Sequence, residues 1–269
     1  MGTSSLMKKI TEKALRSLAL LLLAASLTGC IYWIRAYQTY LQMDEFDRYF
    51  KVVVKDDFTL HFKEPILYSD DFVSLARLHS SQEFPTADGK RWRYWFRKLD
   101  KRNKIVKPEI KFYSDLTFNK DDRITDWSFS PLFLEIAPPK FLEVSLRSLG
   151  GAEINKDKMQ LRANTDLIDK ISATLPKKQD VVAKLGEPIR IDDDKNQEIY
   201  LYRFRLQTHD IEKGYEDRAL SEVRLTFDKS TEELTRMAGR FAGLKISINY
   251  RKFLDRIPDM QLQAVSNRN

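Results

Sequence analysis

The alternation of apolar and polar positions predicts amphipathic strands in two separate parts of the chain. Residues 91–98 and 198–206 alternate apolar and charged side chains, as strands with one solvated face do. Both segments are followed by shorter apolar runs that end at polar turn residues, which is the pattern of an antiparallel meander. These shorter strands are predicted at 58–62, 111–118, 124–129, 223–227 and 234–237.

A spacing of three and four residues predicts helices elsewhere. The longest covers residues 30–50, where aromatic and aliphatic side chains recur at helical intervals and form a broad apolar face. This helix has two possible positions: it packs on the folded body, or it lies in a membrane interface with Trp33 and Tyr37 at the level of the head groups. Shorter helices are predicted at 70–78, 140–149, 166–173 and 177–185.

The chain also contains an internal repeat with an offset of about 110 residues. Matched positions are 22 and then six residues apart in the first copy, and 23 and then seven in the second. We therefore expect two related units of the α+β class. The matched positions are Phe96, Phe118 and Ile124 in the first copy and Phe204, Phe227 and Leu234 in the second.

The amino terminus has the three parts of a secretory leader. Four basic residues precede an apolar run at 18–27, and small residues then lead to Cys30, the one cysteine of the chain. The segment Leu27-Thr28-Gly29-Cys30 resembles a bacterial lipobox. The resemblance implies that the leader is cut before Cys30 and that this residue is acylated, which places the protein on membrane lipid. A chain whose single thiol is consumed in this way needs no disulfides.

An uncleaved signal anchor is the alternative. Residues 17–34 carry no charge, and eighteen residues are just enough to span a bilayer. The basic flank would then stay cytoplasmic and the body would face the same side as in the lipoprotein. If the leader is removed, 240 residues remain and the net charge falls from +7 to +4, because residues 1–29 hold four basic residues and one acidic residue.

Composition and motifs argue against several classes of function. Charged residues make up 32% of the chain but are mixed in sign. They do not form the continuous basic stripe that is typical of nucleic-acid-binding proteins. The three histidines are far apart and no spacing typical of a zinc site occurs. No nucleophile elbow or phosphate loop is present either. We expect a protein that is not an enzyme and holds no metal or cofactor.

The second unit resembles a known family. Residues 181–188, Val-Val-Ala-Lys-Leu-Gly-Glu-Pro, match the Val-x-x-x-Leu-Gly-x-Pro signature of BamE, a small outer-membrane assembly lipoprotein, and the strands at 200–204 and 225–227 match the two that follow in that family. The resemblance covers roughly residues 165–240. It implies a helix pair packed on a three- or four-stranded antiparallel sheet, a fold shared with the tandem-repeat β-lactamase inhibitor protein. The turn at 229–232 lacks the family's usual glycine, and the first unit lacks the signature.

These observations lead to an expected architecture and function. The fold is expected to be two tandem modules, each a helix pair on a small antiparallel sheet, behind the leader. The function is expected to be that of a periplasm-facing lipoprotein which binds an unidentified envelope protein or assists assembly; an inhibitor or ligand-binding module is the alternative. Since Ile31 is not aspartate, the enteric sorting pattern predicts the outer membrane. The expected parts are a signal peptide at 1–29, a membrane-proximal aromatic helix at 30–50, a divergent first module at 51–151, a BamE-like second module at 152–255 and a tail at 256–269.

Overall fold

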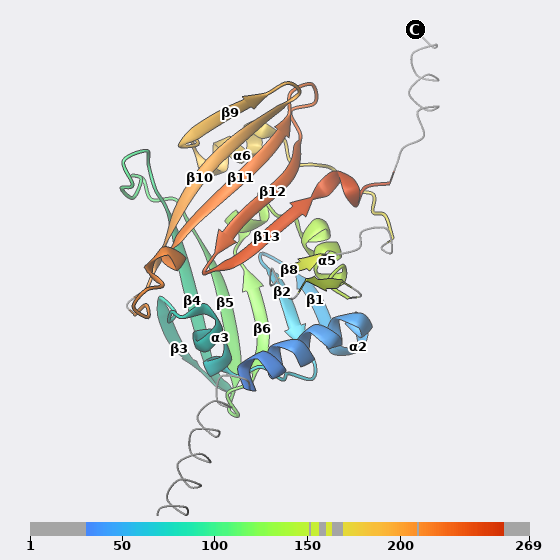
Figure 1. Cartoon of the computed structure of the whole chain (residues 1–269), viewed down its shortest axis with the longest axis vertical. Coiled ribbons are helices and arrows are strands. Elements are labelled where there is room, and N and C mark those ends of the chain that lie inside the picture. The colour runs from blue at the N-terminus through green and yellow to red at the C-terminus, as the bar shows by residue number, and fades with distance from the viewer. Residues whose placement is uncertain (1–30, 151, 156–159, 163–168, 209, 256–269) are drawn as a thin grey trace, which may run out of the picture.

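One large antiparallel sheet of eleven strands dominates the computed structural model (Figure 1). The structure describes residues 31–150, 152–155, 160–162, 169–208 and 210–255. The main strand order is β1-β2-β6-β5-β4-β10-β11-β12-β13, with β3 paired to β4 and β9 paired to β10. The strands are β1 (Phe50–Val54), β2 (Phe58–Phe62), β3 (Gln82–Thr86), β4 (Gly89–Lys98), β5 (Lys111–Asn119), β6 (Ile124–Phe129), β9 (Arg190–Asp194), β10 (Gln197–Gln207), β11 (Leu220–Asp228), β12 (Leu234–Phe241) and β13 (Leu244–Asn249).

The described helices are mostly short. Residues 31–42 form the longest, which we call the N-terminal helix. It continues through the 3-10 turn η1 (Met43–Glu45) into α2 (Phe46–Tyr49), so the expected helix over 30–50 is present from residue 31 to residue 49. The others are α3 (Ser69–Ala76), α4 (Pro131–Leu134), α5 (Pro139–Arg147) and α6 (Lys178–Leu185), with the 3-10 turns η3 (Glu216–Ala219) and η4 (Tyr250–Lys252); a separate hairpin consists of β7 (Glu153–Asn155) and β8 (Gln160–Arg162).

The expected architecture of two modules with helix pairs is wrong. The ends of β4 and β10 pair with each other, 95–98 against 204–207, and this joins the strands of both units into one sheet. Among the residues that the structure describes, each unit has one helix before its hairpin, α3 or α6, instead of two. Of the helix expected at 166–173, residues 169–173 are not helical and Ile171 forms a parallel bridge to Leu254; the remaining residues lie outside the described part. Joining the units removes a free strand edge from each of them. An unpaired edge strand favours aggregation, so the joined sheet is better protected than two separate sheets would be.

The internal repeat is visible in the strand pairing. In both halves a hairpin, β3–β4 or β9–β10, is followed by two further antiparallel strands. The register shifts between Thr117 and Phe118 in the first half and between Thr226 and Phe227 in the second. These residues belong to two Leu-Thr-Phe segments at matched positions of the repeat, 116–118 and 225–227. The matched intervals of the sequence therefore mark equivalent positions of the fold.

The helices of the two halves are equivalent as well. Both α3 and α6 end at a residue with positive φ, Arg77 (61°) and Gly186 (65°). Glycine adopts this conformation at little cost, and the prediction that Gly186 ends its helix is confirmed. The first amide of each helix, from Ser69 or Lys178, donates to a carbonyl in the turn that follows the Leu-Thr-Phe strand. Each helix is therefore tied to its own half of the sheet.

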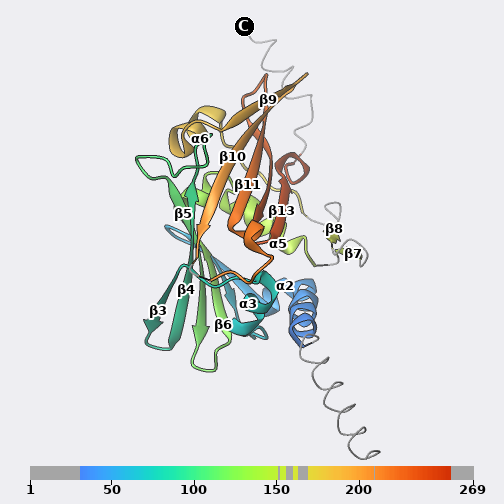
Figure 2. The same cartoon turned by 60° about the vertical axis from the view of Figure 1, so that its left-hand side comes forward.

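The sheet curls at the β4–β10 junction, so that its two halves enclose a common core. Figure 2 shows the halves diverging from this junction, with α5 and the N-terminal helix on the open side. Phe112 of β5 lies at the centre. Its ring centroid is 4.9 Å from that of Phe204, 5.9 Å from that of Phe241 and 5.5 Å from that of Phe133. Phe241 and Phe112 come from strands that are not neighbours in the sheet. Their contact therefore packs the two halves of the curled sheet against each other.

Lys98 links the two halves at the junction. This side chain of β4 is only 3% exposed, and its ammonium donates to the carbonyls of Leu185 and Glu187 at the end of α6, the latter at 2.6 Å. In the other direction, Arg218 of the second half donates to the carbonyl of Leu75 in α3 at 2.7 Å. A cation from each half thus binds the carboxyl-terminal carbonyls of the helix in the other half, where the helix dipole favours positive charge.

The burial of Lys98 predicts a pH dependence of stability. Burial lowers the pKa of Lys98 to about 8, from an ordinary value of 10.5. Between these two values the unfolded chain binds more protons than the folded protein, so the free energy of unfolding rises with pH. We expect the urea midpoint of the wild type to increase from about pH 7.5 to about pH 9.5. Lys98→Met abolishes the increase and the exposed control Lys104→Met retains it; equal slopes in both variants would contradict the assignment.

Candidate functional site

The N-terminal helix is held to the body through a buried carboxylate. Asp71 of α3 has no exposed side-chain surface, and its Oδ1 accepts hydrogen bonds from Arg35 Nη2 at 2.6 Å and Nε at 3.0 Å. The other oxygen, Oδ2, accepts the backbone N–H of Tyr68 at 2.7 Å. The guanidinium also lies 4.7 Å from the ring centroid of Tyr68, within the range of a cation–π contact. Arg35 is therefore fixed by charge, hydrogen bonds and an aromatic face.

Further polar contacts follow along the same side of the helix. Gln42 donates to the carbonyl of Glu64 at 3.0 Å, and the Tyr40 hydroxyl donates to the carbonyl of Ala152 at 2.6 Å. Thr39 is 7% exposed, and its hydroxyl donates to the carbonyl of Arg35 at 3.0 Å. Apolar packing against the body begins at the end of the helix, where buried Phe46 lies 5.3 Å from Phe50 between ring centroids. The side that faces the protein is mostly polar.

The other side of the N-terminal helix is apolar and faces solvent. This is the reverse of an ordinary surface helix, which turns its apolar stripe to the core. Contiguous exposed apolar groups mark a surface that contacts a membrane or another protein. We call this surface the apolar stripe; it consists of Ile31 (43% exposed), Trp33 (55%), Ile34 (49%), Tyr37 (52%) and Leu41 (46%).

The predicted site residues have different outcomes. The lipobox residues Leu27, Thr28, Gly29 and Cys30 lie outside the described residues, so acylation stays a prediction. Trp33 and Tyr37 are described, and both belong to the apolar stripe. The two positions considered for this helix turn out to be compatible, because its polar side packs on the body while its aromatic side remains free.

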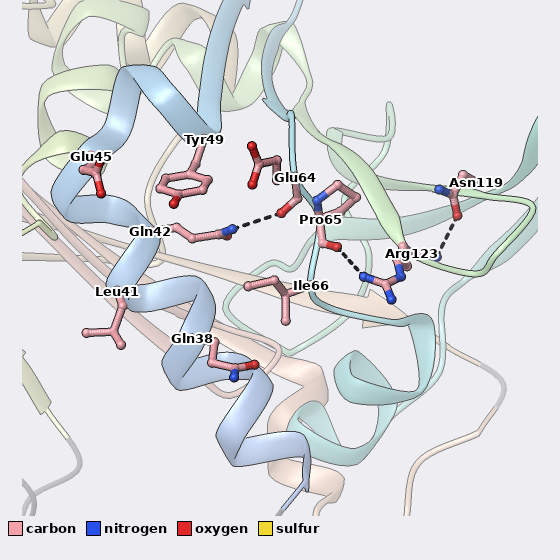
Figure 3. Close-up of a pocket in the computed structure, with 10 residues that line it drawn as sticks. All are labelled: Gln38, Leu41, Gln42, Glu45, Tyr49, Glu64, Pro65, Ile66, Asn119 and Arg123. Atoms are coloured by element: carbon pink, nitrogen blue, oxygen red, sulfur yellow. Dashed lines mark hydrogen bonds between the residues drawn. The ribbon is translucent and has the colours of Figure 1, made fainter.

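A groove of about 760 Å³ runs between the N-terminal helix and the chain that connects β2 to α3 (Figure 3). Arg123 closes one end and donates to the carbonyl of Pro65 at 3.0 Å. Gln42 crosses the groove with its bond to Glu64, and Leu41 of the apolar stripe forms part of the lining. No sequence pattern predicted this groove, because segments far apart in the chain form it. The side chains of Gln42, Asn119 and Arg123 in its lining are engaged in holding the helix and the turns.

Metal-binding side chains do not gather at one place in the described residues. Within them, no cluster of three or more histidine, cysteine, aspartate or glutamate side chains is placed to hold a metal ion. His61 Nδ1 lies 2.8 Å from an Asp126 oxygen on the solvated face of the sheet, and His79 lies 3.8 Å from Asp210. His209 lies outside the described part. Across the described ranges, no helix has the length and apolar character needed to cross a membrane.

Comparisons with known proteins leave the family open. No protein-family model matches this chain, and neither does any curated protein or solved structure. The resemblance of residues 165–240 to BamE thus rests on the short motifs alone and stays a prediction.

Proposed function

We propose that this chain is a lipid-anchored protein of the bacterial cell envelope that lies with its N-terminal helix against the membrane and presents its sheet to a protein partner. The reversed polarity of the N-terminal helix carries the proposal. The polar side of this helix packs on the body, and Trp33, Ile34 and Tyr37 on the other side are exposed to solvent. Such a helix is suited to a membrane interface, where its apolar side enters the lipid.

The lipobox supports the same orientation. An acyl group on Cys30 would place the bilayer one residue before the helix begins, at the end where Ile31, Trp33 and Ile34 are exposed. The lipobox implies a diacylglyceryl group on the thiol and an acyl group on the new amino terminus, and several acyl chains anchor a protein stably. The apolar stripe would then determine how the body lies on that membrane, with the N-terminal helix at the interface. Together with Ile31 in the sorting position, it leads us to place the protein on the periplasmic face of the outer membrane.

Acylation is tested by growth with a labelled fatty acid. The full-length wild type should incorporate the label at Cys30 and run at the size of the mature chain. Cys30→Ala should take up no label and keep its leader, whereas the control Tyr37→Ala should be labelled and processed as the wild type is. A wild type without label, or a Cys30→Ala variant of unchanged mobility and attachment, contradicts the lipoprotein.

The partner is tested by crosslinking in native membranes followed by mass spectrometry. The proposal predicts reproducible crosslinks from the sheet to an envelope protein. If nothing is recovered above background and deletion leaves the envelope unchanged, the interaction role is wrong.

No feature of the described part of the sheet favours the alternative role as an inhibitor or ligand-binding module. Such a module requires an open concave surface on the sheet. The concave side here is filled by Phe96, Phe112, Phe204 and Phe241, each at most 7% exposed.

A further inference from the structure

Three cations lie side by side on the outer face of the sheet, the face opposite to the helices. Arg97 of β4 is directly opposite Lys111 of β5 on one side and directly opposite Arg205 of β10 on the other. Residues that are directly opposite in antiparallel strands point to the same face. The side chain of Arg97 is 31% exposed and that of Lys111 is 44% exposed. Arg205 is exposed as well. We call these three residues the cation row.

The cation row is only partly neutralised by the described residues. Like charges directly opposite each other destabilise a sheet, so such a row needs compensating anions. Glu109 supplies one carboxylate, which pairs with Arg97 and lies 3.9 Å from Lys111; both cations lower the pKa of Glu109. Among the described residues, no carboxylate lies within ion-pair distance of Arg205. Three positive charges therefore share one negative charge.

Two aromatic side chains flank the cation row. Trp95 and Tyr113 are the next outward-facing residues of β4 and β5, and they lie directly opposite each other with ring centroids 5.3 Å apart. Lys111 lies 4.5 Å from the Trp95 centroid, and Arg93 lies 3.8 Å from that of Tyr113. Both rings are half-buried. Aromatic and arginine side chains in one patch are typical of the centres of protein interfaces.

The position of the row argues against the protein's own membrane as its partner. Lys90, at the start of β4, bonds to Ser69 of α3, the helix that holds Arg35. Arg97 is seven residues further along β4, about 23 Å at the rise of a strand. It also faces away from the side that α3 and the N-terminal helix cover. A bilayer against the apolar stripe would not reach the cation row.

We infer that the cation row, with Trp95 and Tyr113, is the docking surface for an acidic segment of a partner protein. Carboxylates of that segment would supply the charge that Arg205 and Lys111 lack, and its apolar groups would cover the two rings. The inference rests on the proposed function and gives the chemical class of its protein partner, which is a protein with an acidic segment. It concerns a different face from the apolar stripe, so it stands or fails independently of acylation.

The test measures binding of a fluorescent oligo-glutamate peptide to the full-length protein in neutral detergent. We expect Arg97→Gln combined with Arg205→Gln to weaken binding at least about tenfold, because two charge-assisted contacts are lost. The control Lys51→Gln combined with Lys55→Gln removes the same net charge at the β1 edge and should change affinity less than about twofold. Binding of the wild type should also weaken from about 50 to about 500 mM NaCl.

Three results overturn the inference. The first is equal affinity of both double variants for the peptide, and the second is no peptide binding by the wild type. The third is loss of binding to phosphatidylglycerol vesicles in the Arg97 and Arg205 variant without any effect on the peptide, which would assign the row to anionic lipid. Circular dichroism confirms that each variant is folded. Fatty-acid labelling of Cys30 separates this failure from failure of the proposed function.

Discussion

Phe112→Ala is expected to lower the free energy of unfolding by about 4 kcal/mol, the usual cost of removing a large aromatic side chain from a packed core. Phe112 is 2% exposed and contacts Phe96 of the first half as well as Phe204 and Phe241 of the second half. The cavity would lie where the curl closes, so the halves cannot collapse onto it independently. Leu244→Ala, at a site that is 52% exposed, is the matched control and should cost less than about 1 kcal/mol.

Denaturation in urea measures this effect and tests whether the halves unfold together. All four tryptophans lie at or before residue 127, so their fluorescence reports the N-terminal helix and the first half, whereas circular dichroism reports both halves. Coincident transitions are expected in the wild type and in Phe112→Ala. Separate transitions in the wild type would show that the shared core does not unite the halves.

Asp71→Ala is expected to release the N-terminal helix and to lower the free energy of unfolding by about 3 kcal/mol. The change leaves the Arg35 guanidinium and the Tyr68 N–H without their acceptor, and removing one partner of a buried ion pair is strongly destabilising. Arg35 is 22% exposed, which places the cost at the lower end for such pairs.

Hydrogen exchange resolved by peptide is the direct measurement for Asp71→Ala. Amides of residues 31–42 should exchange much faster than in the wild type, while those of β10 and β11 change little. Glu45→Ala is the matched control: it breaks an ion pair with Arg48 in which both side chains are about 60% exposed, and such pairs contribute little. Unchanged protection of 31–42 in Asp71→Ala would mean that other contacts hold the helix.

Local features of the fold were predictable because they depend on neighbouring residues. Alternation in 91–98 predicted β4, and Gly186 predicted the end of α6. The spacing of the Leu-Thr-Phe segments predicted a repeat that the pairing register reproduces. The joining of the units was not predictable in this way, since it depends on four residue pairs between 95–98 and 204–207, more than a hundred residues apart.

The same limit applies to the site. Periodicity predicted an apolar face on the N-terminal helix, but its direction depends on Asp71, which is 36 residues from Arg35. Alternation placed Arg97 and Arg205 on solvated faces without indicating that they are neighbours or that Lys111 lies beside Arg97. The helix pair was wrong on two grounds. The family resemblance that implied it covered only part of the chain, and the spacing that predicted a helix at 166–173 did not reveal that Ile171 pairs with Leu254.

The most direct test of the central claim is the depth of the apolar stripe in a bilayer. In the lipidated protein the thiol of Cys30 would carry the lipid, so a cysteine introduced in Tyr37→Cys would be the single thiol available for a nitroxide label. In vesicles this label should be accessible to oxygen and protected from a water-soluble relaxation agent. A label in Lys51→Cys, on the outer face of β1, should remain in water. If the label at position 37 is as exposed to water as the label at position 51, the helix does not lie on the membrane and the account is contradicted.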